Sequence, residues 1–179
     1  MKNSQMRSRF SPGKRALSLA LACAGAAPAA HAAKSWVEHP ADFPSSPLCQ
    51  PNEVTLWTCT VRHERFSLCA SGGAVRRESY IQYRAQDRQG RIALRYPDPL
   101  RAPASAFAYA YAANGDAEVD FAIGSYSYSL VDPLRGTSVL FVDKAGKELA
   151  HLRCDEGNQS LQLNDTIALM RDLGVPSPP

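Results

Sequence analysis

Several features that mark common functional classes are missing from this chain of 179 residues. It has no Gly-rich phosphate loop, no Gly-x-Ser-x-Gly nucleophile elbow and no carboxylate run with calcium-loop spacing. It also lacks a Cys-x-x-Cys pair, and its 4 histidines stand apart in the sequence, so neither a zinc site nor a redox-active thiol pair is indicated. We therefore expect no metal and no cofactor, and no catalytic signature places the chain in an enzyme class.

Long apolar segments are missing as well. The apolar run from Ala16 to Ala24 is well short of the roughly 20 residues that a membrane span requires. It follows a basic segment and precedes Ala30-His31-Ala32, which fits the small-x-small rule for signal cleavage. Residues 1–32 therefore read as a secretory signal peptide, and cleavage near Ala32 would release a soluble periplasmic or secreted protein. Lipidation of Cys23 is the alternative, although the large Leu21 stands where lipidation signals usually have a small residue.

An excess of positive charge is missing once the signal peptide is removed. Residues 1–32 hold 5 of the 20 basic residues and no acidic one, which leaves 15 basic against 17 acidic residues. Nucleic acid is therefore not indicated as a partner. The remaining charge is uneven, with 9 arginines against 4 acids in residues 62–101 and 5 basic against 10 acidic residues in 102–179. A folded domain would then have a basic and an acidic face, either of which can steer a partner of opposite sign.

The hydrophobic pattern predicts an all-β fold. Residues 54–61 and 66–70 form a first hairpin around the polar residues 62–65, and Cys59 shares the inward face with Trp57 and Val61. Further strands are predicted at 78–85, 91–96, 106–112, 116–123, 126–132, 138–143 and 147–154, with turn signals between them that include Asn114-Gly115. The expected fold is a small antiparallel barrel or sandwich of about eight strands.

One helix is predicted near the C-terminus. Asn164 or Asp165 would cap it, Ile167, Leu169, Met170 and Leu173 give it an apolar face, and Gly174 would end it. The proline-rich residues 33–48 read as an extended lead-in, with Trp36 or Phe43 pinned to the domain. A single domain spans 49–175, and residues 176–179 form a disordered tail.

Four cysteines remain after export, and in an oxidising compartment an even number indicates two disulfides. Strand alternation places Cys59 and Cys154 on inward faces, which favours a core bridge between them and a second bridge from Cys49 to Cys69. The other two connectivities stay open. Closing the loop of about 95 residues between Cys59 and Cys154 should contribute roughly 4 kcal/mol to the free energy of unfolding.

Three groups of residues are candidates for function. His63, in the first turn, and His151, on an outward strand face, are the residues for a hydrolase. Asp116, Glu118 and Asp120 alternate along one strand and offer a weak cation site, although such spacing also fits a solvated strand face. Ser125, Tyr126, Ser127 and Tyr128 combine the residue types used at recognition surfaces, and they form the predicted binding site. The alternative is that both tyrosines fill the core.

Four segments carry a family resemblance: Leu56 to Cys59, Tyr80 to Arg84, Gly124 to Tyr128 and Leu152 to Asp155. Together they resemble a group of small exported proteins of Gram-negative bacteria without an assigned function. The chain is more distantly similar to the periplasmic lysozyme inhibitors, which are disulfide-bonded antiparallel β-barrels. Their inhibitory Ser-Gly-x-x-Tyr loop is not kept, because Val75 stands where the tyrosine of that motif belongs.

The sequence thus predicts an exported binding or inhibitory module that acts by surface recognition, and a lysozyme-like envelope enzyme is the most specific partner implied by the resemblance. The alternative is a structural or envelope-maintenance protein without catalytic activity. A small hydrolase that uses His63 or His151 is a third hypothesis.

Overall fold

The computed structural model describes residues 42–71, 79–157 and 160–178. Contacts divide the chain into two units, residues 1–30 and 31–179, and every described residue lies in the second unit. The predicted signal peptide and Trp36 therefore lie outside the described residues. Among the described residues, no helix combines the length and the apolar character needed to cross a membrane.

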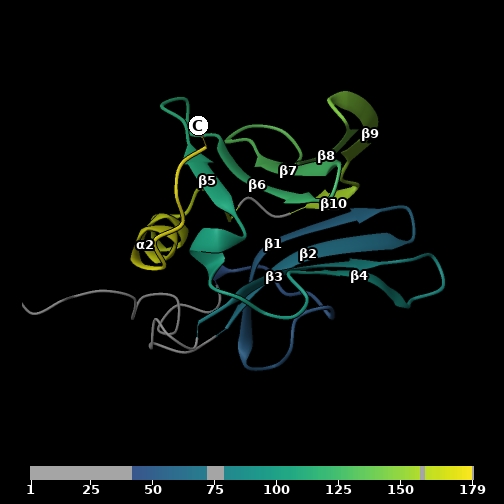
Figure 1. The fold of residues 1–179 in the computed structure, drawn as a ribbon, viewed down its shortest axis with the longest axis horizontal. Coiled ribbons are helices and arrows are strands. Elements are labelled where there is room, and N and C mark those ends of the chain that lie inside the picture. Colours follow the sequence, from purple (N-terminus) through teal and green to yellow (C-terminus); the bar gives the residue numbers. More distant parts are fainter. Residues whose placement is uncertain (1–41, 72–78, 158–159, 179) are drawn as a thin grey trace, which may run out of the picture. The chain divides into compact units, whose positions relative to one another are not determined.

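Two antiparallel sheets of five strands each pack face to face (Figure 1). Sheet A has the order β10-β1-β2-β3-β4 and consists of β1 (Glu53–Val61), β2 (Glu64–Ser71), β3 (Ile81–Gln86), β4 (Ile92–Tyr96) and the short β10 (Glu156–Gly157). Sheet B has the order β5-β6-β7-β8-β9 and consists of β5 (Ala108–Tyr111), β6 (Ala117–Ile123), β7 (Tyr126–Asp132), β8 (Val139–Lys144) and β9 (Lys147–Arg153). The all-β prediction is confirmed, and the architecture is a sandwich.

The first hairpin is tighter than predicted. Its loop has two residues, Arg62 and His63, because Val61 lies opposite Glu64, and Arg62 takes a φ of 57° to make the turn. The predicted four-residue loop, 62–65, would place Val61 opposite Phe66, so the predicted register is wrong by two positions. Since side chains alternate with a period of two, the error changes the partner of Cys59 from Leu68 to Phe66 but keeps its inward face.

Both disulfides join the predicted partners. Cys59 and Cys154 bond across the core, where they are 0% and 3% exposed, and they tie β1 to the end of β9. Cys49 bonds to Cys69 of β2 and fixes the lead-in segment against the outer face of sheet A. Phe43 of that segment is buried, which confirms its predicted role as an anchor.

The sandwich interior holds a cluster of aromatic rings from both sheets. Phe121 of β6 lies at its centre, with ring centroids 4.9 Å from Tyr83, 5.0 Å from Tyr96 and 4.8 Å from Tyr128. Because these partners come from β3, β4 and β7, one side chain links the two sheets.

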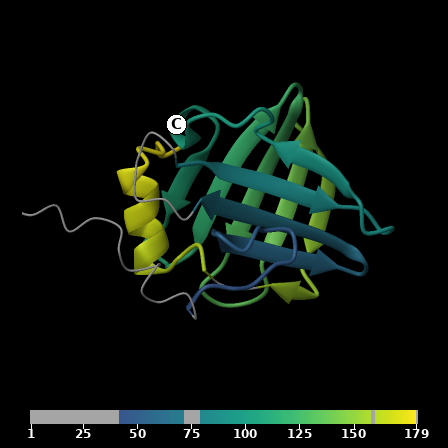
Figure 2. The same cartoon turned by 90° about the horizontal axis from the view of Figure 1, so that it is seen from below.

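Helix α2 (Asn164–Asp172) lies at one end of the sandwich, beside β5 (Figure 2). Its buried residues include Leu169 and Met170 of the predicted apolar face. The predicted cap is wrong, because the N-cap position is Leu163 and no side chain caps the helix. The first helical hydrogen bond runs from the Ile167 N–H to the Leu163 carbonyl (3.0 Å), and the Thr166 hydroxyl ties this turn to the preceding segment by donating to the Ser160 carbonyl (2.7 Å).

The end of α2 follows the prediction, and the first residue of the predicted tail makes a backbone hydrogen bond. Gly174 has a φ of 70°, and the N–H of Val175 donates to the Met170 carbonyl, as in a Schellman motif. A disordered tail was expected from Pro176, yet the Pro176 carbonyl accepts a hydrogen bond from the N–H of Tyr109 (2.8 Å). The anchored chain therefore extends at least to Pro176, because the open edge of β5 offers a backbone donor there.

Candidate functional site

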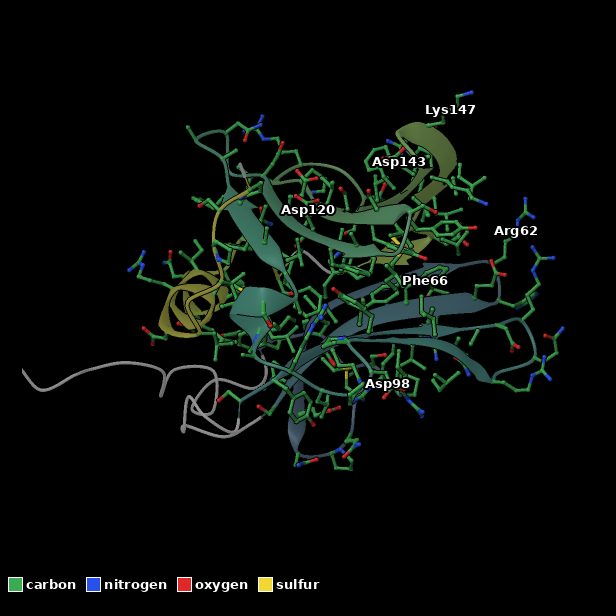
Figure 3. All side chains as sticks on the ribbon, in the orientation of Figure 1. Arg62, Phe66, Asp98, Asp120, Asp143 and Lys147 are labelled. Carbon is green, nitrogen blue, oxygen red and sulfur yellow. A yellow bond between two sulfur atoms is a disulfide. The ribbon has the colours of Figure 1, made fainter. Side chains whose placement is uncertain are left out.

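A groove of about 660 Å³ lies beside β6 and opens onto the outer face of sheet B. Figure 3 shows Asp120 on this face, turned away from sheet A, whereas Phe66 of β2 points between the sheets. The lining residues come from the segment that enters β5, from β6 and from β7: Ala104–Ala108, Glu118, Asp120, Phe121, Ala122, Ser127, Tyr128 and Ser129.

The groove exists because β5 is shorter than β6. The two strands pair from Tyr111 opposite Ala117 to Ala108 opposite Asp120, and β6 then continues for three residues to Ile123. Before Ala108 the chain leaves the sheet and forms the 3-10 helix η2 (Pro103–Ser105), which has a proline at its start. Within the described part of the chain, residues 121–123 therefore have a strand neighbour on the β7 side only.

Two carboxyl groups share the floor of the groove. Glu118 and Asp120 are two residues apart on one face of β6, and the Ser129 hydroxyl of β7 donates to Asp120 Oδ1 (2.5 Å). Partial burial raises the pKa of Glu118, and the charge and hydrogen bond of Asp120 raise it further. Two neighbouring carboxylates oppose each other's ionisation, and either a bound proton or a cationic group beside them relieves the repulsion.

The groove includes half of the predicted binding stretch. Ser127 and Tyr128 line it, but the Tyr128 ring also stacks on Phe121 in the core. Ser125 lies exposed in the turn before β7, and the half-buried Tyr126 ring has the Lys144 ammonium 5.0 Å from its centroid. The structure thus places Ser127 on the same face of sheet B as the carboxyl pair, turns the Tyr128 ring toward the core, and leaves Ser125 and Tyr126 outside the groove.

Sequence reasoning gave Glu118 and Asp120 only a weak role, as members of a cation site with Asp116. Asp116 does not line the groove, because its carboxylate accepts hydrogen bonds from the Leu134 N–H and from Asn114 Nδ2 in the β5–β6 turn. The alternation along β6 revealed that the carboxylates share a face. The strand register places Asp120 opposite Ser129 of β7 and opposite Ala108, the first residue of β5. No sequence pattern indicated this register.

The two histidines lie apart from the groove. His63 is exposed in the turn between β1 and β2, and His151 is exposed on β9, where its ring lies 4.5 Å from that of Phe141. They belong to hairpins of different sheets, and neither lines the groove. The fold therefore does not bring His63 and His151 together, and it does not place either of them in the groove.

A second polar centre lies under the lead-in segment, on the outer side of sheet A. The Arg84 guanidinium donates to both carboxylate oxygens of Glu53 and to the Leu48 carbonyl, each at 2.6 Å. Tyr80 donates its hydroxyl hydrogen to the same carboxylate (2.6 Å). Burial by itself would raise the pKa of Glu53, but the bonds from Arg84 and Tyr80 lower it below its usual value. These side chains satisfy one another, which indicates a structural role.

The sulfur atoms of Cys49 and Cys69 lie within 4.8 Å of a Glu53 carboxylate oxygen, and Cys49 and Glu53 line a small pocket of about 280 Å³. Both sulfurs are used in the disulfide, so they offer no thiolate to a metal. The predicted absence of a metal site stays a prediction.

Comparison with known proteins adds no relative. No protein-family model, no curated protein and no solved structure matches the chain.

Proposed function

We propose that this protein is an exported binding module that recognises a positively charged surface of another cell-envelope protein. The observation that carries the proposal is the groove of sheet B, in which Glu118 and Asp120 lie beside Ser127 and Tyr128. Grooves that combine apolar walls with a few converging polar groups are the usual form of a binding site. The two disulfides support export, because such bonds persist in oxidising compartments.

The partner we propose is a lysozyme-like envelope enzyme, and the module would act on it as an inhibitor. This choice rests on the sequence resemblance to periplasmic lysozyme inhibitors. Since the inhibitory loop of that family is not kept, the acidic groove would supply the contact. The mechanism is occlusion: the module covers a basic surface of the enzyme and needs no chemistry of its own.

The test is a pull-down from envelope extract with the full chain, combined with inhibition assays against several lysozymes. The Glu118→Gln/Asp120→Asn variant should capture less partner and inhibit less, because it removes both charges of the groove at constant side-chain size. A matched control is Asp98→Asn/Glu148→Gln, which removes two exposed charges away from the groove and should behave as the unmodified protein. Co-purification with peptidoglycan alone, without capture or inhibition, would instead favour the envelope-maintenance role.

A further inference from the structure

We infer that the groove binds an extended peptide segment of the partner, which adds to sheet B along the free part of β6 and places a Lys or Arg side chain against Glu118 and Asp120. The inference rests on the proposed function and specifies its mode of recognition. Addition of a strand to an open sheet edge is a common way for a domain to bind a peptide.

The backbone of β6 supports this mode. Gly124 and Ser125 make a two-residue turn that closes on Ile123 and Tyr126, so Ile123 and Phe121 direct their N–H and C=O groups toward β7. Alternate residues of a strand direct these groups to opposite sides, so Ala122 directs its N–H and C=O away from β7, toward the place that β5 would occupy if it began before Ala108. Ala122 is exposed and lines the groove. Among the described residues, no backbone or side-chain group bonds to this N–H and C=O of Ala122, so a peptide in the line of β5 would meet a donor and an acceptor there.

The side chains determine the charge of the peptide. A residue placed opposite Ala122 points its side chain to the same face as Ala122, which is also the face of Glu118 and Asp120. The diagonal neighbour of such a residue is Asp120, within reach of a long side chain. A Lys or Arg at this position would meet two carboxyl groups and relieve their mutual repulsion, which is expressed in the raised pKa of Glu118. An acidic residue at the same position would be repelled.

The geometry also limits the length of the paired segment. Three residues of β6, 121–123, extend beyond Ala108, and a strand rises about 3.3 Å per residue, so the free edge is roughly 10 Å long. The paired part of the peptide is therefore short and contains one basic residue. The free edge of β6 is too short to pair with a long strand of the partner.

The experiment selects linear heptapeptides from a displayed library against the full chain. Each recovered peptide is resynthesised in two altered forms, one with its basic residue changed to Glu and one with alternate backbone amides methylated. Binding is measured by calorimetry, and hydrogen exchange of the Ala122 amide is measured by NMR. The protein variants are Glu118→Gln/Asp120→Asn and the control Asp98→Asn/Glu148→Gln.

We expect the recovered peptides to carry Lys or Arg and to protect the Ala122 amide from exchange. Binding should weaken about tenfold in Glu118→Gln/Asp120→Asn, should be unchanged in the control, and should be lost on methylation of the amides that face β6. Peptides that bind the groove variant as tightly, or that tolerate methylation of every amide, would overturn the inference, as would a failure to recover any peptide. The proposed function would survive these results if Glu118→Gln/Asp120→Asn still reduced capture in the pull-down, and it would fall only if that dependence were also absent.

Discussion

At the scale of single residues, substitutions at two glycines can distinguish the cost of backbone strain from the cost of steric crowding. Gly115 and Gly146 both have positive φ angles, of 89° and 77°. A Cβ at Gly115 would come within 2.8 Å of the Leu134 side chain, whereas a Cβ at Gly146 would meet nothing within 4 Å. We predict that Gly146→Ala lowers the free energy of unfolding by about 1 kcal/mol and that Gly115→Ala lowers it further. Urea denaturation of both variants checks the order, and equal losses would show that Leu134 moves aside freely.

The buried ion pair makes a second prediction at this scale. The Arg84 and Glu53 side chains are 7% and 0% exposed, so Arg84→Met would leave a buried carboxylate without its partner. The expected loss in the free energy of unfolding is about 3 kcal/mol or more. Arg91→Met is the matched control, because Arg91 forms an ion pair with Asp87 but its side chain is 76% exposed. The control should lose no more than about 1 kcal/mol. Similar losses in the two variants, measured by urea denaturation, would contradict the structural role of Arg84.

At the scale of elements, the two disulfides should contribute unequally. Cys59–Cys154 spans 95 positions of the sequence and Cys49–Cys69 spans 20. On the chain-entropy estimate, removing the disulfide that closes the longer loop lowers the free energy of unfolding by roughly 4 to 5 kcal/mol, and removing the one that closes the shorter loop lowers it by about 3 kcal/mol. Denaturant unfolding of the two double Cys→Ala variants tests this order. The opposite order would mean that the lead-in segment contributes to stability mainly through contacts that depend on its disulfide.

The elements also show where sequence reasoning succeeds. The strands of sheet B were located from the alternation of apolar and polar residues and from turn signals. In β6, for example, Ala117, Val119 and Phe121 are buried, and the residues between them lie on the opposite face of the sheet. The register of a hairpin was harder to predict than its strands. A loop that is two residues shorter changes every cross-strand partner, but it leaves each side chain on the same face of the sheet. The N-cap was missed because the helix begins after Leu163, whose side chain cannot cap it, and composition alone pointed to the polar Asn164 and Asp165.

At the scale of the whole molecule, two buried carboxyl groups predict an unusual dependence of stability on pH. Asp132 accepts hydrogen bonds from the Ser138 hydroxyl (2.7 Å) and the Leu161 N–H (2.9 Å), yet burial raises its pKa to about 6. The native state therefore holds this proton more tightly than the unfolded chain. The resulting stabilisation is complete below the unfolded pKa of 3.8 and is lost as the pH rises through about 6. The pKa of Glu53 is lowered, so its stabilisation is lost as the pH falls below 4.5.

We therefore expect the free energy of unfolding to rise by roughly 2 kcal/mol between pH 7 and about pH 4.5 and to fall again in more acidic solution. Asp132→Asn should flatten the neutral side of this curve and leave the acidic side, which depends on Glu53. Thermal and urea denaturation across this pH range measure both sides, and NMR titration of the Asp132 carboxyl carbon gives its pKa directly. A free energy that falls steadily from pH 7 to pH 4.5 would contradict the assignment.

The sequence by itself determined the all-β class, the C-terminal helix and the inward face of Cys59 and Cys154, and so it favoured the disulfide pairing that the structure shows. Each of these depends on local periodicity and turn chemistry, which neighbouring residues encode. Only the tertiary structure decided that β5 begins at Ala108, and that Ser127 of β7 lines one groove with Glu118 and Asp120 of β6. These features arise from strand register and from the route of the chain before β5, where residues far apart in the sequence compete for the same sheet edge, and no local pattern records the outcome.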